Sequence, residues 1–139
     1  MYAVVDIEAT GGNHIKGKII EIAIYIYDGT KIIDEFSTLI NPKTNIDWYV
    51  TKLTGITNKM VSNAPVFNEV AAEIASIVQG NIFVAHDVDF DYMFLKTELK
   101  NNNDSHLRFE RRRDGRTQEH KEAAVRACPT FVLDRLDVG

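Results

Sequence analysis

The pattern of apolar and polar positions predicts a β-sheet in the first forty residues. Residues 2–8 form an apolar run that ends in two acids and predicts a central strand. Residues 18–27 alternate with a period of two, and one face carries Ile20, Ile22, Ile24 and Ile26. We expect residues 31–40 to return as a third, antiparallel strand. Between them, Asp28-Gly29 predicts a tight type I′ hairpin turn.

Helical spacing becomes clear after Pro65. Apolar residues recur one turn apart and predict a helix ended by Gly80, with a stripe of Phe67, Val70, Ala71, Ile74, Ile77 and Val78. Residues 43–65 are less regular, with a short helix expected at 57–61. Residues 81–85 are apolar without alternation, as in a strand covered on both faces. A right-handed crossover would place this strand parallel to residues 2–8.

The pattern therefore predicts an α/β fold with a mixed sheet flanked by helices, in which a parallel fourth strand joins three antiparallel ones. A last helix is expected through about Lys100, with Phe90, Met93, Phe94 and Thr97 on its inner side. Asp91 would lie in its first turn, where the helix dipole favours an anion. Either Asp87 or Asp89 is expected as its N-cap.

Acidic side chains gather where these elements end. Asp6 and Glu8 point to the same side of their strand, with Cα atoms about 6.6 Å apart. A strand parallel to theirs would bring Asp91 to the same edge of the sheet. Carboxylates that converge repel one another unless a cation lies between them, and oxygen ligands suit Mg²⁺ or Mn²⁺. An ordinary charged strand end is the alternative interpretation of Asp6 and Glu8.

A calcium-binding loop is a second interpretation of the acids that begin at Asp87. Their spacing, followed by Glu98, matches positions 1, 3, 5 and 12 of an EF-hand. The required glycine at the sixth position is Tyr92, and apolar residues occupy the proposed loop. The pattern does not favour an EF-hand. A P-loop nucleotide-binding motif and a serine nucleophile elbow are also absent from the sequence.

Composition changes this picture mainly in the last third of the chain. The 139 residues, 45% of them hydrophobic, are enough for one domain with a core. No apolar run is long enough to span a membrane, and a single Cys128 offers neither a disulfide nor a thiolate metal cluster, so a cytoplasmic location is expected. Residues 1–100 contain eight Lys and no Arg, whereas residues 101–139 contain one Lys and seven Arg. We expect residues 1–100 to be one incomplete domain and residues 101–139 to be an atypical, Arg-rich segment of frameshifted or non-native origin. A natural domain with a basic C-terminal arm is the alternative.

Two motifs at compatible spacing resemble a known family. Asp-Ile-Glu-Ala-Thr-Gly at 6–11 and Val-Ala-His-Asp-Val-Asp-Phe-Asp-Tyr-Met-Phe-Leu at 84–95 resemble the first two motifs of the DEDD (DEDDh-type) 3′-5′ exonucleases. The nearest branch is the proofreading epsilon subunit of bacterial DNA polymerase III, which Leu53-Thr54-Gly55-Ile56-Thr57 also resembles. The resemblance covers residues 1–100.

The resemblance implies a ribonuclease-H-like fold and hydrolysis of nucleic acid from its 3′ end with two divalent ions, Mg²⁺ or Mn²⁺. It implies that Asp6, Glu8 and Asp91 are the catalytic and metal-binding residues. By the same resemblance, the substrate-binding residues that border the terminal nucleotide are Ala9, Thr10, Gly11 and His86. A histidine hydrogen-bonded at a strand end is the other interpretation of His86. The implied partners are a single-stranded nucleic-acid 3′ end and a DNA polymerase; no membrane is implied.

The third motif of the family is missing after residue 100. That motif, His-x4-Asp, supplies the general base and the last metal ligand, but Arg111 follows His106 and Val125 follows His120 at this spacing. Asp87 also stands where the family has Asn. Without a base we expect little or no turnover, since general-base catalysis contributes about 10² to 10⁴-fold. The alternative is a non-catalytic nucleic-acid-binding or polymerase-interaction module, with Arg111, Arg112, Arg113 and Arg116 contacting phosphates.

Overall fold

The fold is built on a four-stranded mixed sheet. The computed structural model describes residues 1–102. The strands are β1 (Tyr2–Ala9), β2 (Ile19–Tyr27), β3 (Ile32–Leu39) and β4 (Ile82–Val84), in the order β3-β2-β1-β4. β1 pairs antiparallel with β2, β2 antiparallel with β3, and β4 parallel with β1. The predicted mixed sheet is confirmed.

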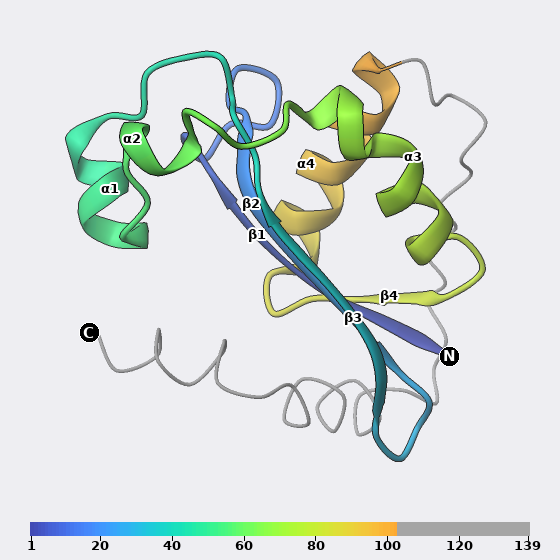
Figure 1. Cartoon of the computed structure of the whole chain (residues 1–139). Coiled ribbons are helices and arrows are strands. Elements are labelled where there is room, and N and C mark those ends of the chain that lie inside the picture. The colour runs from blue at the N-terminus through green and yellow to red at the C-terminus, as the bar shows by residue number, and fades with distance from the viewer. Residues whose placement is uncertain (103–139) are drawn as a thin grey trace.

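Helices lie on both sides of this sheet (Figure 1). The helices are α1 (Trp48–Thr54), α2 (Asn58–Val61), α3 (Phe67–Val78) and α4 (Val88–Asn101). α1 and α2 lie on one side of the sheet, and α3 and α4 on the other. The main core lies under α3 and α4, where apolar residues of β1 and β2 meet Ala71, Ile74, Phe94, Leu95 and Leu99. Tertiary packing of these apolar faces holds α3 and α4 in place.

A β-bulge near the end of β1 changes which residues of β2 face the main core. Glu8 pairs with Glu21 but Ala9 pairs with Ile19, so β2 has one residue more than β1 at this point. Ile19 and Ile22 therefore face the main core, while Ile20 packs under α1 and α2 with Val50. The prediction that Ile20 shares a face with Ile22, Ile24 and Ile26 was wrong, because a bulge interrupts the period of two.

The hairpin between β2 and β3 is present, but its predicted turn type was wrong. Tyr27 pairs with Ile32, which leaves a four-residue loop. Only Gly29 has positive φ there, at 103°, whereas a type I′ turn needs two such residues. The Asp28 carboxylate accepts hydrogen bonds from the backbone N–H of Thr30 and Lys31. These bonds lower the pKa of Asp28 and stabilise the four-residue loop.

α1 was not anticipated by the hydrophobic pattern. It has seven residues and one buried side chain, Val50, so it is too short to show a period. The local signals were Asp47 at its N-cap position and Gly55 just after its end, with φ of 75°. The arginines at 111–113 and 116, predicted to contact phosphates in the binding-module alternative, lie outside the described residues.

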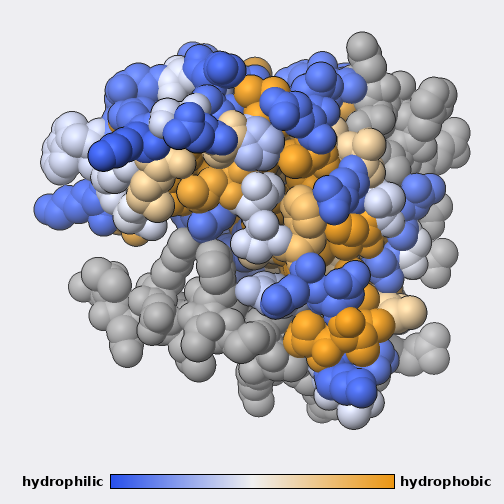
Figure 2. All heavy atoms as spheres, viewed as in Figure 1, coloured by the Kyte–Doolittle hydropathy of each residue, from blue (hydrophilic) through white to orange (hydrophobic). Residues whose placement is uncertain are grey.

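In the view of Figure 2, hydrophobic side chains run down the middle of the molecule over β3, with hydrophilic ones on either side. Ile33 of β3 is 47% exposed. Among the described residues, no helix is both long and apolar enough to cross a lipid bilayer.

Candidate active site

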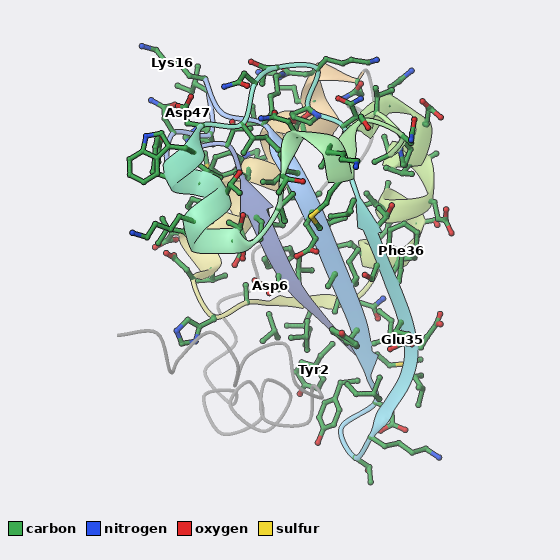
Figure 3. The ribbon with its side chains drawn as sticks, turned by 60° about the vertical axis from the view of Figure 1, so that its left-hand side comes forward. Tyr2, Asp6, Lys16, Glu35, Phe36 and Asp47 are labelled. Atoms are coloured by element: carbon green, nitrogen blue, oxygen red, sulfur yellow. The ribbon has the colours of Figure 1, made fainter. Side chains whose placement is uncertain are left out.

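The first two acids of the site lie on the α1 side of β1. Alternate residues Ala3, Val5 and Ile7 face the main core, so Asp6 and Glu8 face the other way. Both acids are half-buried. Figure 3 shows Asp6 midway along β1, below α1. The predicted shared orientation of Asp6 and Glu8 agrees with this strand geometry.

A further glutamate joins these two acids. Glu21 of β2 pairs directly with Glu8 across the antiparallel ladder, and paired residues project to the same face of a sheet. Burial raises the pKa of Glu21, and the negative charge of Asp6 raises it further. The sequence placed Glu21 correctly on the face opposite Ile22, but it was not considered a site residue. Only the cross-strand register reveals this neighbour.

Asp91 reaches the site from α4, at the edge of β1 that β4 leaves open. β4 pairs only with Tyr2, Ala3 and Val4. Beyond Val4, the backbone N–H of Ile7 donates to Oδ1 of Asp91 at 3.1 Å. A side chain that is only 4% exposed thus takes the place of a neighbouring strand. The predicted position of Asp91, in the first turn of this helix and beside the end of β1, is what the structure has.

The charges of Asp91 and Asp6 interact. Burial, and then the negative charge of Asp6, raises the pKa of Asp91 to about 8; the Ile7 hydrogen bond lowers it and Asp87 raises it. Without a counter-charge, Asp91 is therefore protonated at neutral pH. The structure brings Asp6 and Asp91 together as an electrostatically coupled pair.

Turn residues before α4 fix the start of this helix. Asp87 is the N-cap, and its side chain accepts from the backbone N–H of Phe90 at 3.2 Å. This resolves the choice between Asp87 and Asp89. His86 is exposed in the turn that precedes the cap. The inner side of α4 carries Phe94, Leu95 and Leu99, whereas the expected Met93 is 36% exposed.

The segment after β1 closes into a loop at Thr10. Its backbone N–H donates to the Lys18 carbonyl at 2.8 Å, and its hydroxyl accepts from the Lys18 N–H at 2.9 Å. Ala9 is buried, while Gly11 is half-exposed, and a Cβ atom on Gly11 would meet nothing within 4 Å. Thus Thr10 and Gly11 lie directly after the acids, with space beside the glycine.

The donor chemistry of this site fits a divalent cation. Oxygen ligands are available from carboxylates, and the raised pKa of Asp91 beside Asp6 is the electrostatic condition that a cation would relieve. Within residues 1–102, no three His, Cys, Asp or Glu side chains lie close enough together to hold a metal ion. A metal centre with ligands from Asp6, Glu8 and Asp91 therefore remains a prediction.

A second acid of α4, Glu98, is also buried, with 6% exposed. Burial raises its pKa, while the charge of Lys18 and a hydrogen bond from the Ile19 N–H act in the opposite direction. The sequence did not indicate that Glu98 is buried, because glutamate is usually exposed and its partner Ile19 lies far away along the chain.

Comparison with known families and proteins identifies one family. A family model described as "Exonuclease" matches residues 3–121. The 3′-5′ exonuclease DinG of Bacillus subtilis (strain 168) is 42% identical over 99 residues, which cover 70% of this chain and 11% of that protein. The PolC-type DNA polymerase III of Caldanaerobacter subterraneus subsp. tengcongensis is 40% identical over 99 residues, covering 71% of this chain and 7% of that protein. The chain thus spans about a tenth of the length of these curated relatives.

Solved structures agree. Exonuclease X in complex with 5′ overhanging duplex DNA is 31% identical with a TM-score of 0.57, and the match covers 68% of this chain and 54% of that one. Apo exonuclease I has a TM-score of 0.68 at 16% identity, over 79% of this chain and 27% of that one, and is evidence for the fold alone. The fold is ribonuclease-H-like, as the sequence resemblance implied.

Proposed function

The chain belongs to the exonuclease family, whose model matches residues 3–121, and from this we propose that it is a 3′-5′ exonuclease domain that hydrolyses phosphodiester bonds in nucleic acid. The observation that carries the proposal is the coupling of two carboxylates, Asp6 and Asp91, that are distant in sequence and meet at the end of β1. The substrate would be a single-stranded 3′ end. DinG, a relative named as a 3′-5′ exonuclease, supports this direction of attack.

Asp6, Glu8 and Asp91 would hold two Mg²⁺ or Mn²⁺ ions. Such ions supply an oriented water and stabilise negative charge on the phosphate. Asp6 and Glu8 would be ligands from β1, and Asp91 would complete the site from α4. The Ile7 hydrogen bond, at 3.1 Å, would keep one Asp91 oxygen fixed while the other faces the site.

Four residues would receive the 3′-terminal nucleotide. Ala9, Thr10 and Gly11 follow the acids directly, and the absence of a side chain at Gly11 leaves room for a sugar or base. His86 would line the same pocket from the turn before α4, where it is exposed to an incoming ligand. The end of β1, the loop that follows it and the turn before α4 would therefore contact the substrate.

Turnover by this chain should be slow, because residues 101–139 contain no His-x4-Asp sequence to provide a general base. A typical enzyme turns over about 10 times per second. Loss of a general base lowers a rate by about 10² to 10⁴-fold. We expect about 10⁻¹ to 10⁻³ per second from these two ranges. The alternative is a non-catalytic module that binds nucleic acid or a polymerase. A relative named as a PolC-type DNA polymerase III supports a polymerase as the partner.

The test is digestion of labelled single-stranded oligonucleotides by the full chain, with Mn²⁺ or with a chelator. A 5′ label shows shortening from the 3′ end as a ladder, and matched DNA and RNA versions compare the two substrates. Glu8→Gln should abolish digestion. Glu35→Gln, an exposed glutamate in β3, is the matched control and should digest like the wild type.

The possible outcomes distinguish the proposed activity from the non-catalytic alternative. Slow, Mn²⁺-dependent laddering that Glu8→Gln removes supports the proposed activity. Binding without any cleavage supports the non-catalytic alternative. Robust digestion at several turnovers per second would refute the expectation of impaired catalysis while leaving the exonuclease assignment intact.

A further inference from the structure

α4 contacts the β1–β2 loop at a place separate from Asp91. We use the name β1–β2 loop for residues 10–18. Glu98, two helical turns after Asp91, accepts a hydrogen bond from the backbone N–H of Ile19 at 3.4 Å. The charge of Lys18, the last residue of the loop, favours the ionised form of Glu98. Glu98 thus meets the chain where the loop becomes β2.

Phe94 makes a second contact with the same loop. Its ring packs edge-on against His14, with centroids 6.4 Å apart. A Cβ atom on Gly17 would lie 3.0 Å from the Phe94 ring and 2.7 Å from the Asn13 carbonyl oxygen. Only glycine therefore allows the loop backbone to approach α4 so closely.

The loop transmits this contact to the candidate site. Lys18, beside Glu98, is bonded through both its N–H and its carbonyl to Thr10. Thr10 lies two residues after Glu8. One helix thus fixes Asp91 against β1 at one end and holds the far end of the loop at the other.

We propose that Glu98 is a positioning residue, which anchors the β1–β2 loop to α4 and so holds Thr10 and Gly11 in place for the 3′-terminal nucleotide. The anchoring stands on contacts within the protein, whereas the benefit to the nucleotide rests on the proposed exonuclease function. Glu98 itself does not contact the reacting atoms. Its effect should therefore appear in nucleotide binding more than in the chemical step.

The test compares three variants of the full chain. Glu98→Ala removes the acceptor. Glu98→Gln keeps an acceptor oxygen and the shape of the side chain. Glu73→Ala changes an exposed glutamate of α3 and is the control. Amide hydrogen exchange, measured without metal, reports on the loop, and titration with thymidine 5′-monophosphate and Mn²⁺ reports on the binding of a nucleotide.

We expect Glu98→Ala to raise exchange at the Thr10, Lys18 and Ile19 amides by at least about tenfold, without a matching rise in the α3 amides. Mononucleotide affinity should fall by about tenfold, because part of the binding free energy is then used to order the loop. Glu98→Gln should restore both to within about threefold of the wild type. The Glu73→Ala control should match the wild type.

Unchanged loop exchange in Glu98→Ala would overturn the proposed anchoring. A rise spread equally over the loop and α3 would also overturn it, since that pattern indicates loss of global stability alone. If the loop loosens but mononucleotide affinity is unchanged, the positioning role is wrong. If the wild type binds no mononucleotide, the proposed function fails, and the exchange data still decide whether Glu98 anchors the loop.

Discussion

Asp91→Asn should make the metal-free protein more stable at neutral pH, although changes at buried residues usually destabilise. Asparagine retains an oxygen to accept the Ile7 N–H, now 3.1 Å from the Asp91 carboxylate. It also removes the cost of keeping a carboxyl group in a buried position beside Asp6. The variant therefore separates the hydrogen bond from the charge.

The size of the effect follows from the pKa of Asp91, which is raised from 3.8 to about 8. At pH 7 the folded protein holds a proton on Asp91 that the unfolded chain has released. Each unit between the ordinary pKa and the pH is worth about 1.4 kcal/mol, which gives at most about 4 kcal/mol at pH 7. Relaxation and water entry reduce such costs, so we expect a gain of about 2 to 4 kcal/mol. At about 3 to 4 °C per kcal/mol, Tm should rise by about 6 to 16 °C.

The sign of the pH dependence is fixed by the direction of the shift. Because the folded pKa is raised, the contribution of Asp91 is fully present below its unfolded pKa of 3.8 and is lost as the pH rises to about 8. The advantage of Asp91→Asn should therefore be absent near pH 4 and grow toward pH 8. Burial also raises the pKa of Glu21 and Glu98, so the difference between the two proteins is the quantity to follow.

Thermal and urea unfolding, followed by circular dichroism in a chelator from pH 4 to 8, measures this difference. Asp89→Asn, at an exposed position in the same helical turn, is the control and should bring no gain. Adding Mn²⁺ should stabilise the wild type and leave the variant nearly unchanged. An Asp91→Asn protein that is less stable than the wild type at pH 7, or a difference that does not vary with pH, would refute the reasoning.

Three further predictions follow from local geometry. Gly17→Ala should cost about 1 to 3 kcal/mol in unfolding free energy, because its Cβ would lie 2.7 Å from the Asn13 carbonyl oxygen; Gly12→Ala, with nothing within 4 Å, should cost little, and equal Tm values for the two variants would contradict this. Thr57→Ala should cost about 1 kcal/mol, because the Thr57 hydroxyl caps α2 by accepting from the Met60 N–H at 3.1 Å; an unchanged urea midpoint would count against the cap. Trp48 is the single tryptophan and is 76% exposed. Its fluorescence should be quenched when an oligonucleotide binds, since α1 packs on Ile20 next to Glu21. Unchanged fluorescence, while another method detects binding, would place the ligand elsewhere.

The strands were predictable because each has a simple pattern. Period two marked β2, and an apolar run without alternation marked β4. The pairing of Asp6 with Asp91 followed from one further rule, the right-handed crossover that makes β4 parallel to β1. These elements depend on local pattern and on chain handedness, both of which are present in a single sequence.

The features that the sequence did not predict depend on strand register and on residues that become neighbours only in the fold. Glu21 became part of the site only when the β1–β2 register paired it with Glu8, and the bulge that moves Ile20 to the other face has no clear sequence signal. The role of Glu98 could not be predicted, because its neighbours Ile19 and Lys18 are distant from it in sequence and become adjacent only in the fold. α1 was missed because seven residues with one buried side chain do not repeat often enough to show a helical period.

β4 ends after three residues, at Val84. The number of residues from Val84 to Asp91 then determines whether the Asp91 carboxylate reaches the backbone N–H of Ile7. An α-helix turns by about 100° per residue. A single insertion or deletion between the cap at Asp87 and Asp91 would swing the carboxylate away from the Ile7 N–H and bring a neighbouring side chain to the strand edge. Length, more than composition, is therefore the property of this short connection that the domain has least freedom to change.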